Sequence, residues 1–367
     1  MKSKDICNDR VTCTGCEACA NVCPKDAIRM ERDWRGFLYP AVDQSRCVDC
    51  GLCRKRCPAN QPPLEPFTLG MARAFVDGDR ERLRVASSGG AFGVVARHVL
   101  DAGGVVYGCT MDEDYNVTYI AVDNADDLTK LYGSKYVQSA VGMTYRAVKA
   151  TLDAGRKAFF CGCPCQVAAL RQFLGKDCEG LLTMDLICHG VPSQPYFKDY
   201  VRDLRKQGVR VFRFRYKPEL YGETKENSSV KVGYSSRDYY MTHFLWGKGC
   251  RACCYRCRYA GGARPGDFTA GDFWNNAVAR LPIDGSHGAS LVLFNTPKAQ
   301  KLESIFKDAG TCLPLTTMHD AIGDDGGQLA HPSKNDPRTD LMYMAWRLFG
   351  VRGPKALFKL ERMLFHI

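Results

Sequence analysis

The sequence predicts two units of different fold class, a small cysteine-rich α+β module and, after it, a larger mixed α/β domain. Three observations support this division. A repeated cysteine pattern is confined to the first 60 residues. Three prolines follow between residues 59 and 67, where they deny the chain helical hydrogen bonds and favour an extended link. From Met71 onward, short β-branched or aromatic runs alternate with helix-like segments, which is typical of an α/β domain.

The cysteine-rich module contains the pattern C-x2-C-x2-C-x3-C-P twice, over residues 13–24 and again over residues 47–58. Three cysteines with this spacing can bind three irons of one cubane, while the fourth, which precedes a proline, binds the neighbouring cluster. The spacing therefore predicts two [4Fe-4S] clusters with crossed ligands. Cluster one is predicted to take Cys13, Cys16, Cys19 and Cys57, and cluster two to take Cys47, Cys50, Cys53 and Cys23.

Structural zinc is the alternative for these cysteines. Zinc sites usually join two separated C-x2-C pairs rather than tight triplets, so the spacing favours iron-sulfur clusters. The doubled pattern resembles that of the bacterial two-cluster ferredoxins, and the resemblance covers about the first sixty residues. We therefore predict a ferredoxin-type domain over residues 1–60 and a proline-rich linker over residues 61–70.

Two polar loops of the α/β domain are candidate phosphate sites. Ser88, Gly89 and Gly90 precede an amphipathic segment at 91–100 that we predict to be a helix, and free amides at a helix start can bind phosphate. The full G-x-G-x-x-G spacing is absent, so a plain helix cap explains these residues equally well. A second loop, over residues 132–139, combines a lysine with hydroxyl side chains and is a weak signal alone.

Further cysteines follow apolar runs of the α/β domain. Cys165 lies where a strand-like run meets a helix-like segment, Cys188 ends another apolar run, and four cysteines crowd into GCRACCYRC. Turns after apolar strands commonly carry sites. We therefore predict that a third [4Fe-4S] cluster is bound by Cys165, Cys188, Cys254 and Cys257. Zinc bound by the same set and unligated buried thiols are the alternatives. The role of the four cysteines next to these ligands in sequence stays open, and they are Cys161, Cys163, Cys250 and Cys253.

A different spacing involves Cys250, Cys254 and Cys257, which form C-x3-C-x2-C, as in radical S-adenosylmethionine enzymes. In that family the motif lies near the start of the barrel and an aromatic residue usually precedes the last cysteine. Here the motif lies late in the chain and Arg256 holds that place. A radical enzyme is therefore the least favoured hypothesis.

Three other segments carry weaker signals. Residues 209–217 alternate, which predicts a strand with Arg213, Arg215 and Lys217 on one face, either solvated or facing an acidic coenzyme or ferredoxin. His189, beside a candidate metal ligand, is a candidate proton donor, and a structural imidazole is equally consistent. The basic tail has the periodicity of an amphipathic helix that docks on the protein surface.

Several segments together resemble the coenzyme F420 hydrogenase/dehydrogenase beta-subunit family. They occur in the family's order between about residues 71 and 295, and they are SSGGAFGVVARHVL, GSKYVQS, GCPCQVAAL, DLICHGVPS, FRYK, CYRC and DFTAGDFW. The set is far more specific than any one segment. It implies a flavin-binding part over residues 71–175, a C-terminal part with the additional cluster cysteines over residues 176–335, and a helical tail over residues 336–367.

The resemblance also implies a cofactor and its contacts. It implies noncovalent FAD and a cluster on the four cysteines predicted above. This sequence departs from the family pattern at Cys163, where threonine is usual, and has Cys250 and Cys253 in addition. The residues implied to lie near the flavin or its phosphates are Ser88, Gly89, Gly90, Ser134, Lys135 and Tyr136.

These inferences together predict an FAD-dependent iron-sulfur oxidoreductase that passes electrons between ferredoxin-type clusters and FAD, and on to F420 or an unidentified organic substrate. The expected partners are ferredoxin or another redox protein and a small organic substrate or F420. The alternative is an electron-transfer subunit that connects a partner enzyme to a ferredoxin pool. The sequence does not identify the terminal substrate, because the residues that would line its pocket carry no motif.

Composition is consistent with this prediction. The 367 residues, 45% hydrophobic and 25% charged, suffice for two or three domains, and no apolar run approaches the roughly 18 residues of a membrane helix. The start of the chain lacks the apolar core of a signal peptide, so we expect a cytoplasmic protein that is not integral to a membrane. Two clusters of about −2 each reduce the formal charge of +11 to about +7, and nucleic-acid binding is not required.

Overall fold

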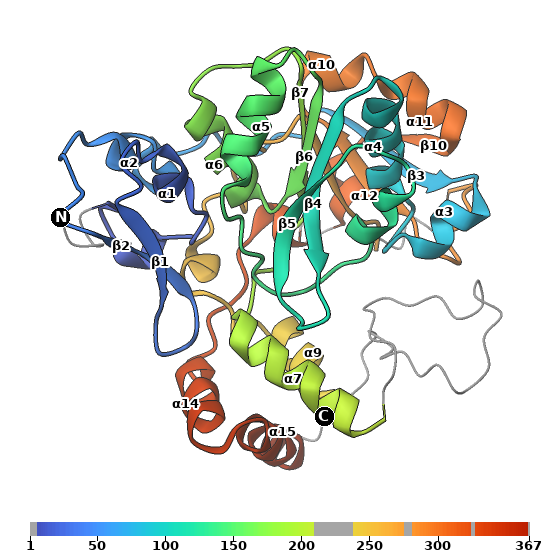
Figure 1. Ribbon diagram of the computed structural model, residues 1–367. Helices are drawn as coiled ribbons and strands as arrows, with labels where there is room; N and C mark the ends of the chain where they lie inside the picture. The colour runs from blue at the N-terminus through green and yellow to red at the C-terminus, as the bar shows by residue number, and fades with distance from the viewer. Residues whose placement is uncertain (1–5, 209–237, 275–280, 324–326, 366–367) are drawn as a thin grey trace.

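The computed structural model describes residues 6–208, 238–274, 281–323 and 327–365 (Figure 1). The predicted basic strand at residues 209–217 lies outside the described residues. The remaining chain forms a small N-terminal module, a large α/β domain and a group of helices below it in the view of Figure 1. The fold class predicted from the sequence is confirmed.

The N-terminal module is built on one antiparallel hairpin. Strands β1 (Ile28–Arg32) and β2 (Leu38–Val42) pair with Ile28 opposite Val42. Two short helices, α1 (Ala18–Val22) and α2 (Leu52–Lys55), pack against each other, and each carries a cysteine of one repeat. The 3-10 turn η2 (Arg10–Thr12) ends next to Cys13, the first of the eight cysteines, and η3 (Pro58–Asn60) begins directly after Cys57, the last of them.

The α/β domain contains one eight-stranded mixed sheet with the order β10-β3-β9-β8-β7-β6-β4-β5. Its centre is parallel, from β4 through β6 and β7 to β8, and the remaining pairs are antiparallel. The strands are β3 (Met71–Asp77), β4 (Val105–Met111), β5 (Val117–Val122), β6 (Ala158–Gly162), β7 (Leu181–Leu186), β8 (Phe268–Asp272), β9 (Ser290–Phe294) and β10 (Gly310–Leu315).

Helices cover both faces of this sheet, because alternate residues of its central strands point to opposite sides. Phe159 of β6 belongs to the core under α4 (Ala91–Asp101) and α11 (Glu303–Ala309). Its neighbour Phe160 belongs to the core under α5 (Thr144–Asp153) and α6 (Pro164–Leu174). Central strands buried on both faces read as the continuous apolar runs seen in the sequence.

A third, aromatic core joins the helices that follow the sheet. It includes Tyr196, Tyr240 and Tyr343. The ring centroid of Tyr196 lies 5.4 Å from that of Tyr240 and 5.7 Å from that of Tyr343. Its main helices are α7 (Gln194–Lys206), α9 (Tyr239–Leu245), α14 (Thr339–Phe349) and α15 (Arg352–Phe365). Smaller elements are α3 (Arg80–Val85), α10 (Pro297–Gln300), α12 (Met318–Ile322), α13 (Gly327–Ala330), η4 (Asp127–Leu131) and η5 (Ala252–Arg256). Of the helices that the structure describes, none is long and apolar enough to cross a membrane.

Buried polar contacts bind the N-terminal module to the α/β domain. The Glu17 carboxylate accepts hydrogen bonds from the amides of Val141 and Gly142, at 2.8 and 3.1 Å. Arg146 of α5 donates to the carbonyl of Asn21 at 2.7 Å, and Arg258 donates to that of Pro58 at 2.6 Å. Residues 61–70 form no helix or strand and run beside residues 261–263. The two units are therefore packed together rather than joined by a free tether.

Candidate functional site

The first group of cysteines gathers inside the N-terminal module, beside the α/β domain. Burial raises the pKa of Cys19 well above its usual value, and the charges of Cys16, Cys13 and Cys57 add to this shift. Cys57, which comes from the second repeat, therefore lies with three cysteines of the first. This is the neighbourhood that crossed ligation requires.

Cys7 is a ninth cysteine beside this group, and no sequence signal pointed to it. Its Sγ atom lies 3.5 Å from Cys57 Sγ, and its side chain is 3% exposed. Hydrogen bonds with Cys13 and Cys57, together with burial, raise the pKa of Cys7, so it carries its proton. Donation from Cys7, with a smaller contribution from the charge of Arg251, lowers the pKa of Cys13 to about 6 against the effect of burial. A lowered pKa favours the thiolate, which is the form that binds metal.

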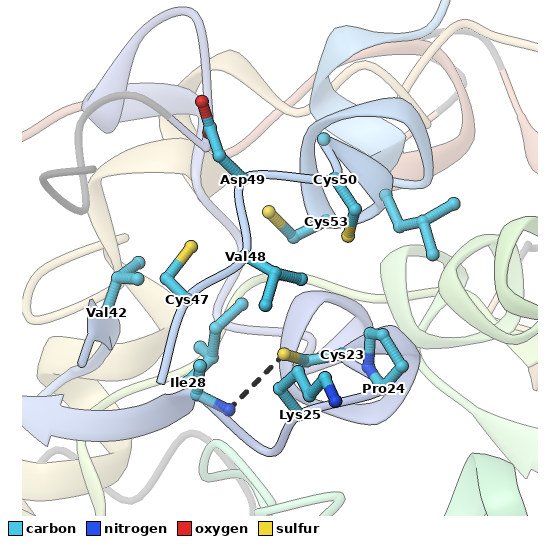
Figure 2. Close-up of a pocket in the computed structure, with 13 residues that line it drawn as sticks. Cys23, Pro24, Lys25, Ile28, Val42, Cys47, Val48, Asp49, Cys50 and Cys53 are labelled. Carbon is cyan, nitrogen blue, oxygen red and sulfur yellow. Dashed lines mark hydrogen bonds between the residues drawn. The ribbon is translucent and has the colours of Figure 1, made fainter. Parts of the chain in front are cut away.

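The second group lines a pocket at the outer end of the module (Figure 2). Cys47, Cys50 and Cys53 come from the second repeat, and Cys23 reaches in from the first. Burial raises the pKa of Cys53, and Cys23, Cys50 and Cys47 act in the same direction. The amide of Ala27 donates to Cys23 Sγ at 3.3 Å. Cys50 is exposed, so this group is open to the molecular surface.

The third group gathers at the carboxyl ends of β6 and β7. Cys165 starts α6 after β6, Cys188 follows β7, and Cys254 and Cys257 come from η5 and the residue after it. Burial raises the pKa of Cys165 well above its usual value, and Cys188, Cys257 and Cys254 are among the charges that add to the shift. The carboxyl ends of parallel strands share one edge of a sheet, which is why residues distant in sequence meet here.

Three of the four unassigned cysteines border this third group. The Sγ atoms of Cys188 and Cys163 lie 3.8 Å apart in a hydrogen bond, and this contact lowers the pKa of Cys188 to about 7. Cys250 packs on Gly190 so closely that a Cβ atom added there would lie 2.8 Å from Cys250 Sγ. Cys253 accepts a hydrogen bond from Cys254, which raises the pKa of Cys254. By contrast, Cys161 neighbours Cys109 and Lys135.

The first and third groups are neighbours across the boundary between the module and the domain. Cys16 contributes to the raised pKa of Cys165. The pKa of the buried Tyr259 is raised mainly by burial, and the charges of Cys165 and Cys16 add to this shift. Tyr145 on α5 is likewise affected by both. The buried side chains of Tyr259 and Tyr145 therefore lie beside both groups.

The donor atoms of all three groups are sulfur. Each group offers four thiols and no carboxylate, which is the donor chemistry of a [4Fe-4S] cluster and also of structural zinc. A single zinc ion with Zn–S bonds of about 2.3 Å would draw its ligands closely together. Among the described residues, no group of three or more histidine, cysteine, aspartate or glutamate side chains is arranged to hold a single metal ion.

The two polar loops predicted from the sequence meet in the structure. The amide of Ser134 donates to Ser87 Oγ at 2.7 Å, and the two hydroxyl oxygens are 3.0 Å apart. Gly90, with φ of +94°, is the N-cap of α4. A Cβ atom at Gly89 would lie 2.1 Å from the carbonyl oxygen of Phe75. Any other residue at this position would therefore require the backbone to move. Ser87, which is not among the flavin contacts predicted from the sequence, therefore connects the two loops.

The other predicted flavin contacts are engaged with the protein. Ser88 Oγ donates to the carbonyl of Ala289 at 2.6 Å. Lys135 Nζ donates to the carbonyls of Leu131 and Tyr132, both at 3.0 Å, and burial lowers its pKa. The carbonyl of Tyr136 accepts from the Tyr240 hydroxyl at 2.9 Å. The ammonium group of Lys135 therefore binds backbone carbonyls of its own loop and stabilises the conformation of that loop.

These loops fit an anionic cofactor through their surroundings. Tyr132 follows η4 and lies against Gly93 of α4, where a Cβ atom would be 2.2 Å from its hydroxyl oxygen. Burial raises the pKa of Tyr132, but the positive charges of Arg97 and Arg82 oppose the shift. Arg82 pairs with the carboxylates of Asp77 and Asp79, so Arg97 is the arginine whose charge favours the binding of phosphate beside this helix start.

His189 lies between the third cysteine group and the second loop. Its Nδ1 atom is 3.0 Å from Gln328 Nε2. Its ring centroid is 5.1 Å from that of Phe244, which in turn lies 5.3 Å from the ring of Tyr136. Burial lowers the pKa of His189, so the neutral imidazole is favoured. This position is compatible with a proton donor and with a structural imidazole alike.

Comparison with known proteins gives two family matches. Residues 155–314 match the family model for the C terminus of the coenzyme F420 hydrogenase/dehydrogenase beta subunit. Residues 12–61 match the 4Fe-4S dicluster domain. The first match includes the third cysteine group, and the second includes the first and second groups.

Relatives match mainly the N-terminal module. An uncharacterized ferredoxin of Methanocaldococcus jannaschii is 41% identical over 56 residues, 15% of this chain and 71% of that one. The putative electron transport protein YsaA of Escherichia coli is 45% identical over 58 residues, 15% of this chain and 34% of that one. NADH-quinone oxidoreductase subunit I of Pelobacter propionicus is 30% identical over 82 residues, 20% of this chain and 42% of that one. The chain thus spans well under half of the last two relatives.

A similar solved structure is a chain of the xenon-derivatized F420-reducing [NiFe] hydrogenase complex from Methanosarcina barkeri. The two are 16% identical, with a TM-score of 0.47 over 83% of this chain and 95% of that one. The family matches agree with the repeated cysteine pattern and with the arrangement of the cysteine groups. The chain is an iron-sulfur electron-transfer protein that is related, over residues 155–314, to the coenzyme F420 hydrogenase/dehydrogenase beta subunit and carries an N-terminal 4Fe-4S dicluster domain.

Proposed function

We propose that this protein is an FAD-dependent iron-sulfur oxidoreductase that passes electrons between a one-electron carrier protein and F420 or another small organic substrate. The observation that carries the proposal is the proximity of the first and third cysteine groups: helix α1, which carries Cys19, packs against α6, which carries Cys165, and the charge of Cys16 adds to the raised pKa of Cys165. Adjacent cofactor sites are what electron transfer through a protein requires. When bound, the clusters transfer one electron at a time, and FAD converts between one-electron and two-electron transfer.

We propose twelve cysteines as ligands of three [4Fe-4S] clusters. Hydrogen bonds hold several of these ligands in place: the amide of Ala27 donates to Cys23, Cys7 is hydrogen-bonded to Cys57, and Cys163 is hydrogen-bonded to Cys188. The ligands are Cys13, Cys16, Cys19 and Cys57 for cluster one, Cys47, Cys50, Cys53 and Cys23 for cluster two, and Cys165, Cys188, Cys254 and Cys257 for cluster three.

We assign FAD to the region where the loops at 87–90 and 133–136 meet. Support comes from the Ser87–Ser134 hydrogen bonds, from the start of α4 and from the positive charge near Tyr132. In this assignment Lys135 positions the loop, because its ammonium is bound to two backbone carbonyls. The predicted division into a flavin-binding part over residues 71–175 and a further cluster part over residues 176–335 remains our proposal.

The exposed second group supplies the contact with a protein partner in this proposal. Cys50 is exposed and the neighbouring Val48 is 59% exposed, whereas Cys13, Cys19 and Cys57 of the first group are buried. Ferredoxin or another small redox protein can therefore dock directly over cluster two at the molecular surface. We therefore assign the one-electron partner to this end of the molecule and the organic substrate to the flavin end.

Anaerobic reconstitution with iron, sulfide and FAD tests the proposal. We expect about twelve irons per chain and a flavin that acid precipitation releases. The variant Cys254→Ser should lose about four irons while the two N-terminal clusters persist, and Cys178→Ser, which changes a cysteine outside all three groups, should lose none. About eight irons in the unmodified protein would contradict the third cluster, and absence of flavin after gel filtration would contradict the FAD assignment.

An electron-transfer subunit that only connects a partner enzyme to a ferredoxin pool is the second candidate. The similarity of the N-terminal module to a subunit of a larger oxidoreductase favours it. The two functions differ in what the isolated chain can do. Steady-state reduction of F420 by the isolated, fully loaded protein supports the enzyme, and exchange with ferredoxin or a viologen alone supports the second candidate.

A further inference from the structure

Arg251 connects the third cysteine group to the first. It lies between Cys250 and Cys253, yet its side chain extends into the N-terminal module and is fully buried. Its Nε atom donates to the carbonyl of Cys13 at 2.7 Å, and its Nη2 atom approaches Cys13 Sγ at 3.6 Å. Its Nη1 atom lies 3.3 Å from Gln138 Oε1. The guanidinium is therefore fixed against a proposed ligand of cluster one.

The ligand loop is shaped to receive this guanidinium. Gly15, between Cys13 and Cys16, has φ of +65°, and a Cβ atom there would lie 2.8 Å from Arg251 Nη1. The guanidinium carbon also lies 4.1 Å from the ring centroid of Tyr39. The positive-φ turn at Gly15, the ring of Tyr39 and three hydrogen-bond acceptors thus surround one charged group.

The charge of Arg251 is balanced by sulfur rather than by a carboxylate. In the described part of the chain, the hydrogen-bond partners of Arg251 are the carbonyl and the sulfur of Cys13 and the amide oxygen of Gln138, and none of them is a carboxylate. Arginine keeps its charge in proteins, and a buried cation requires compensation. Negative charge on the neighbouring sulfur is therefore the available counterpart.

We propose that Arg251 is a positioning residue that raises the reduction potential of cluster one and makes it the favoured electron acceptor beside cluster three. The inference rests on the proposed function. Reduction adds one electron and no proton to a cluster, so a fixed neighbouring cation stabilises the reduced form more than the oxidised form. A donor to a ligand sulfur acts in the same direction. The electron comes from the neighbouring cluster or from the partner protein.

Potentiometric titration of the loaded protein, followed by electron paramagnetic resonance, measures this effect. Arg251→Met removes the charge and the donors, and we expect the one-electron equilibrium constant of cluster one to fall about tenfold, which is 59 mV. Arg251→Lys keeps the charge and should retain most of the potential. Arg146→Met is the matched control, because it removes an arginine that binds the same module through Asn21 and Cys23, away from Cys13. Its cluster-one potential should not change.

Two further measurements make the outcome decisive. Cys53→Ser identifies the signal of cluster two, so that the signal of cluster one can be assigned. Unmodified protein labelled with ¹⁵N-arginine should show a ¹⁵N coupling to reduced cluster one that the Arg251→Lys variant lacks. This measurement decides the question even where Arg251→Met fails to fold or to bind iron.

An unchanged potential in a fully loaded Arg251→Met protein would overturn this inference alone. Absence of the ¹⁵N coupling in the unmodified protein would do the same. Iron analysis that found no cluster on the first cysteine group would instead overturn the proposed function together with this inference. The two failures are therefore distinguishable.

Discussion

At the scale of single residues, hydrogen bonds with neighbouring thiols shift the pKa values of the proposed ligands. Cys7 is hydrogen-bonded in the first group and Cys163 in the third, and these contacts lower the pKa of Cys13 to about 6 and that of Cys188 to about 7. The positive charges of Arg251 near Cys13 and Arg264 near Cys188 act in the same direction, so both cysteines are shifted toward the thiolate form. Cys7 and Cys163 thus have a physical role as hydrogen-bond partners of proposed ligands.

Cys7→Ala should leave the iron content unchanged and lower the potential of cluster one. The variant removes a hydrogen bond to Cys57 and Cys13 but no proposed ligand. Cys57→Ala is the comparison, because it should cost about four irons and change the signal of the cluster that Cys13 serves. Iron analysis and electron paramagnetic resonance of both variants check this. Loss of iron from Cys7→Ala with retention in Cys57→Ala would mean that Cys7 is the ligand.

At the scale of elements, the turn between β3 and α4 depends on close backbone contact. Gly89 packs against the carbonyl of Phe75 and the amide of Ser290, so that β3, β9 and the start of α4 meet without a side chain. Gly89→Ala should destabilise the protein by about 3 kcal/mol through overpacking and should release flavin. Gly70→Ala, with nothing within 4 Å of the added Cβ, is the control. Urea unfolding and gel filtration measure both effects, and equal stability of the two variants would contradict the prediction.

Helix α15 is held to the domain by a buried ionic group. Glu361 pairs with Lys248 at 2.6 Å and with His243 at 3.2 Å, and all three side chains are almost fully buried. Burial lowers the pKa of His243 below its usual 6.5, although Glu361 partly offsets this effect. The unfolded chain therefore binds a proton at higher pH than the folded chain, and stability falls as the pH drops through about 6.5.

His243→Gln should reduce this loss of stability on acidification, because the group that titrates is gone. Urea unfolding of the loaded protein at about pH 7.5 and about pH 5.5 measures the difference. His331→Gln, which changes an exposed histidine, should keep the pH dependence of the unmodified protein. A His243→Gln protein that lost as much stability as the unmodified protein would show that His243 does not cause the effect.

Elements with a strong local signal were predictable from the sequence. The helix predicted at 91–100 is α4 (Ala91–Asp101), and the apolar runs before Cys165 and Cys188 are strands at the centre of the sheet. The site was predictable where chemistry is written as spacing, as in the two cysteine repeats. The roles of Arg251 and Cys7 were not, because a buried arginine and an extra cysteine carry no local pattern that distinguishes them from surface or core residues. Their partners lie 238 and 50 residues away in sequence.

At the scale of the whole molecule, the N-terminal module and the α/β domain depend on each other. Removal of residues 1–60 would expose the buried guanidinium of Arg251 and the amides that Glu17 binds. We therefore expect the chain that starts at residue 61 to be unstable and aggregation-prone, because a buried polar group that loses its partner costs free energy. Limited proteolysis and far-ultraviolet circular dichroism check this. A truncated chain that is folded and retains flavin would show that the two units are independent.

The placement of Arg251 also constrains the maturation of the protein. The guanidinium and the ring of Tyr39 cover the loop that carries Cys13, and the boundary between module and domain closes over the same sulfurs. We therefore expect iron and sulfide to reach the first group more slowly than the exposed second group when the protein is reconstituted. A lost cluster one would then be replaced more slowly than a lost cluster two.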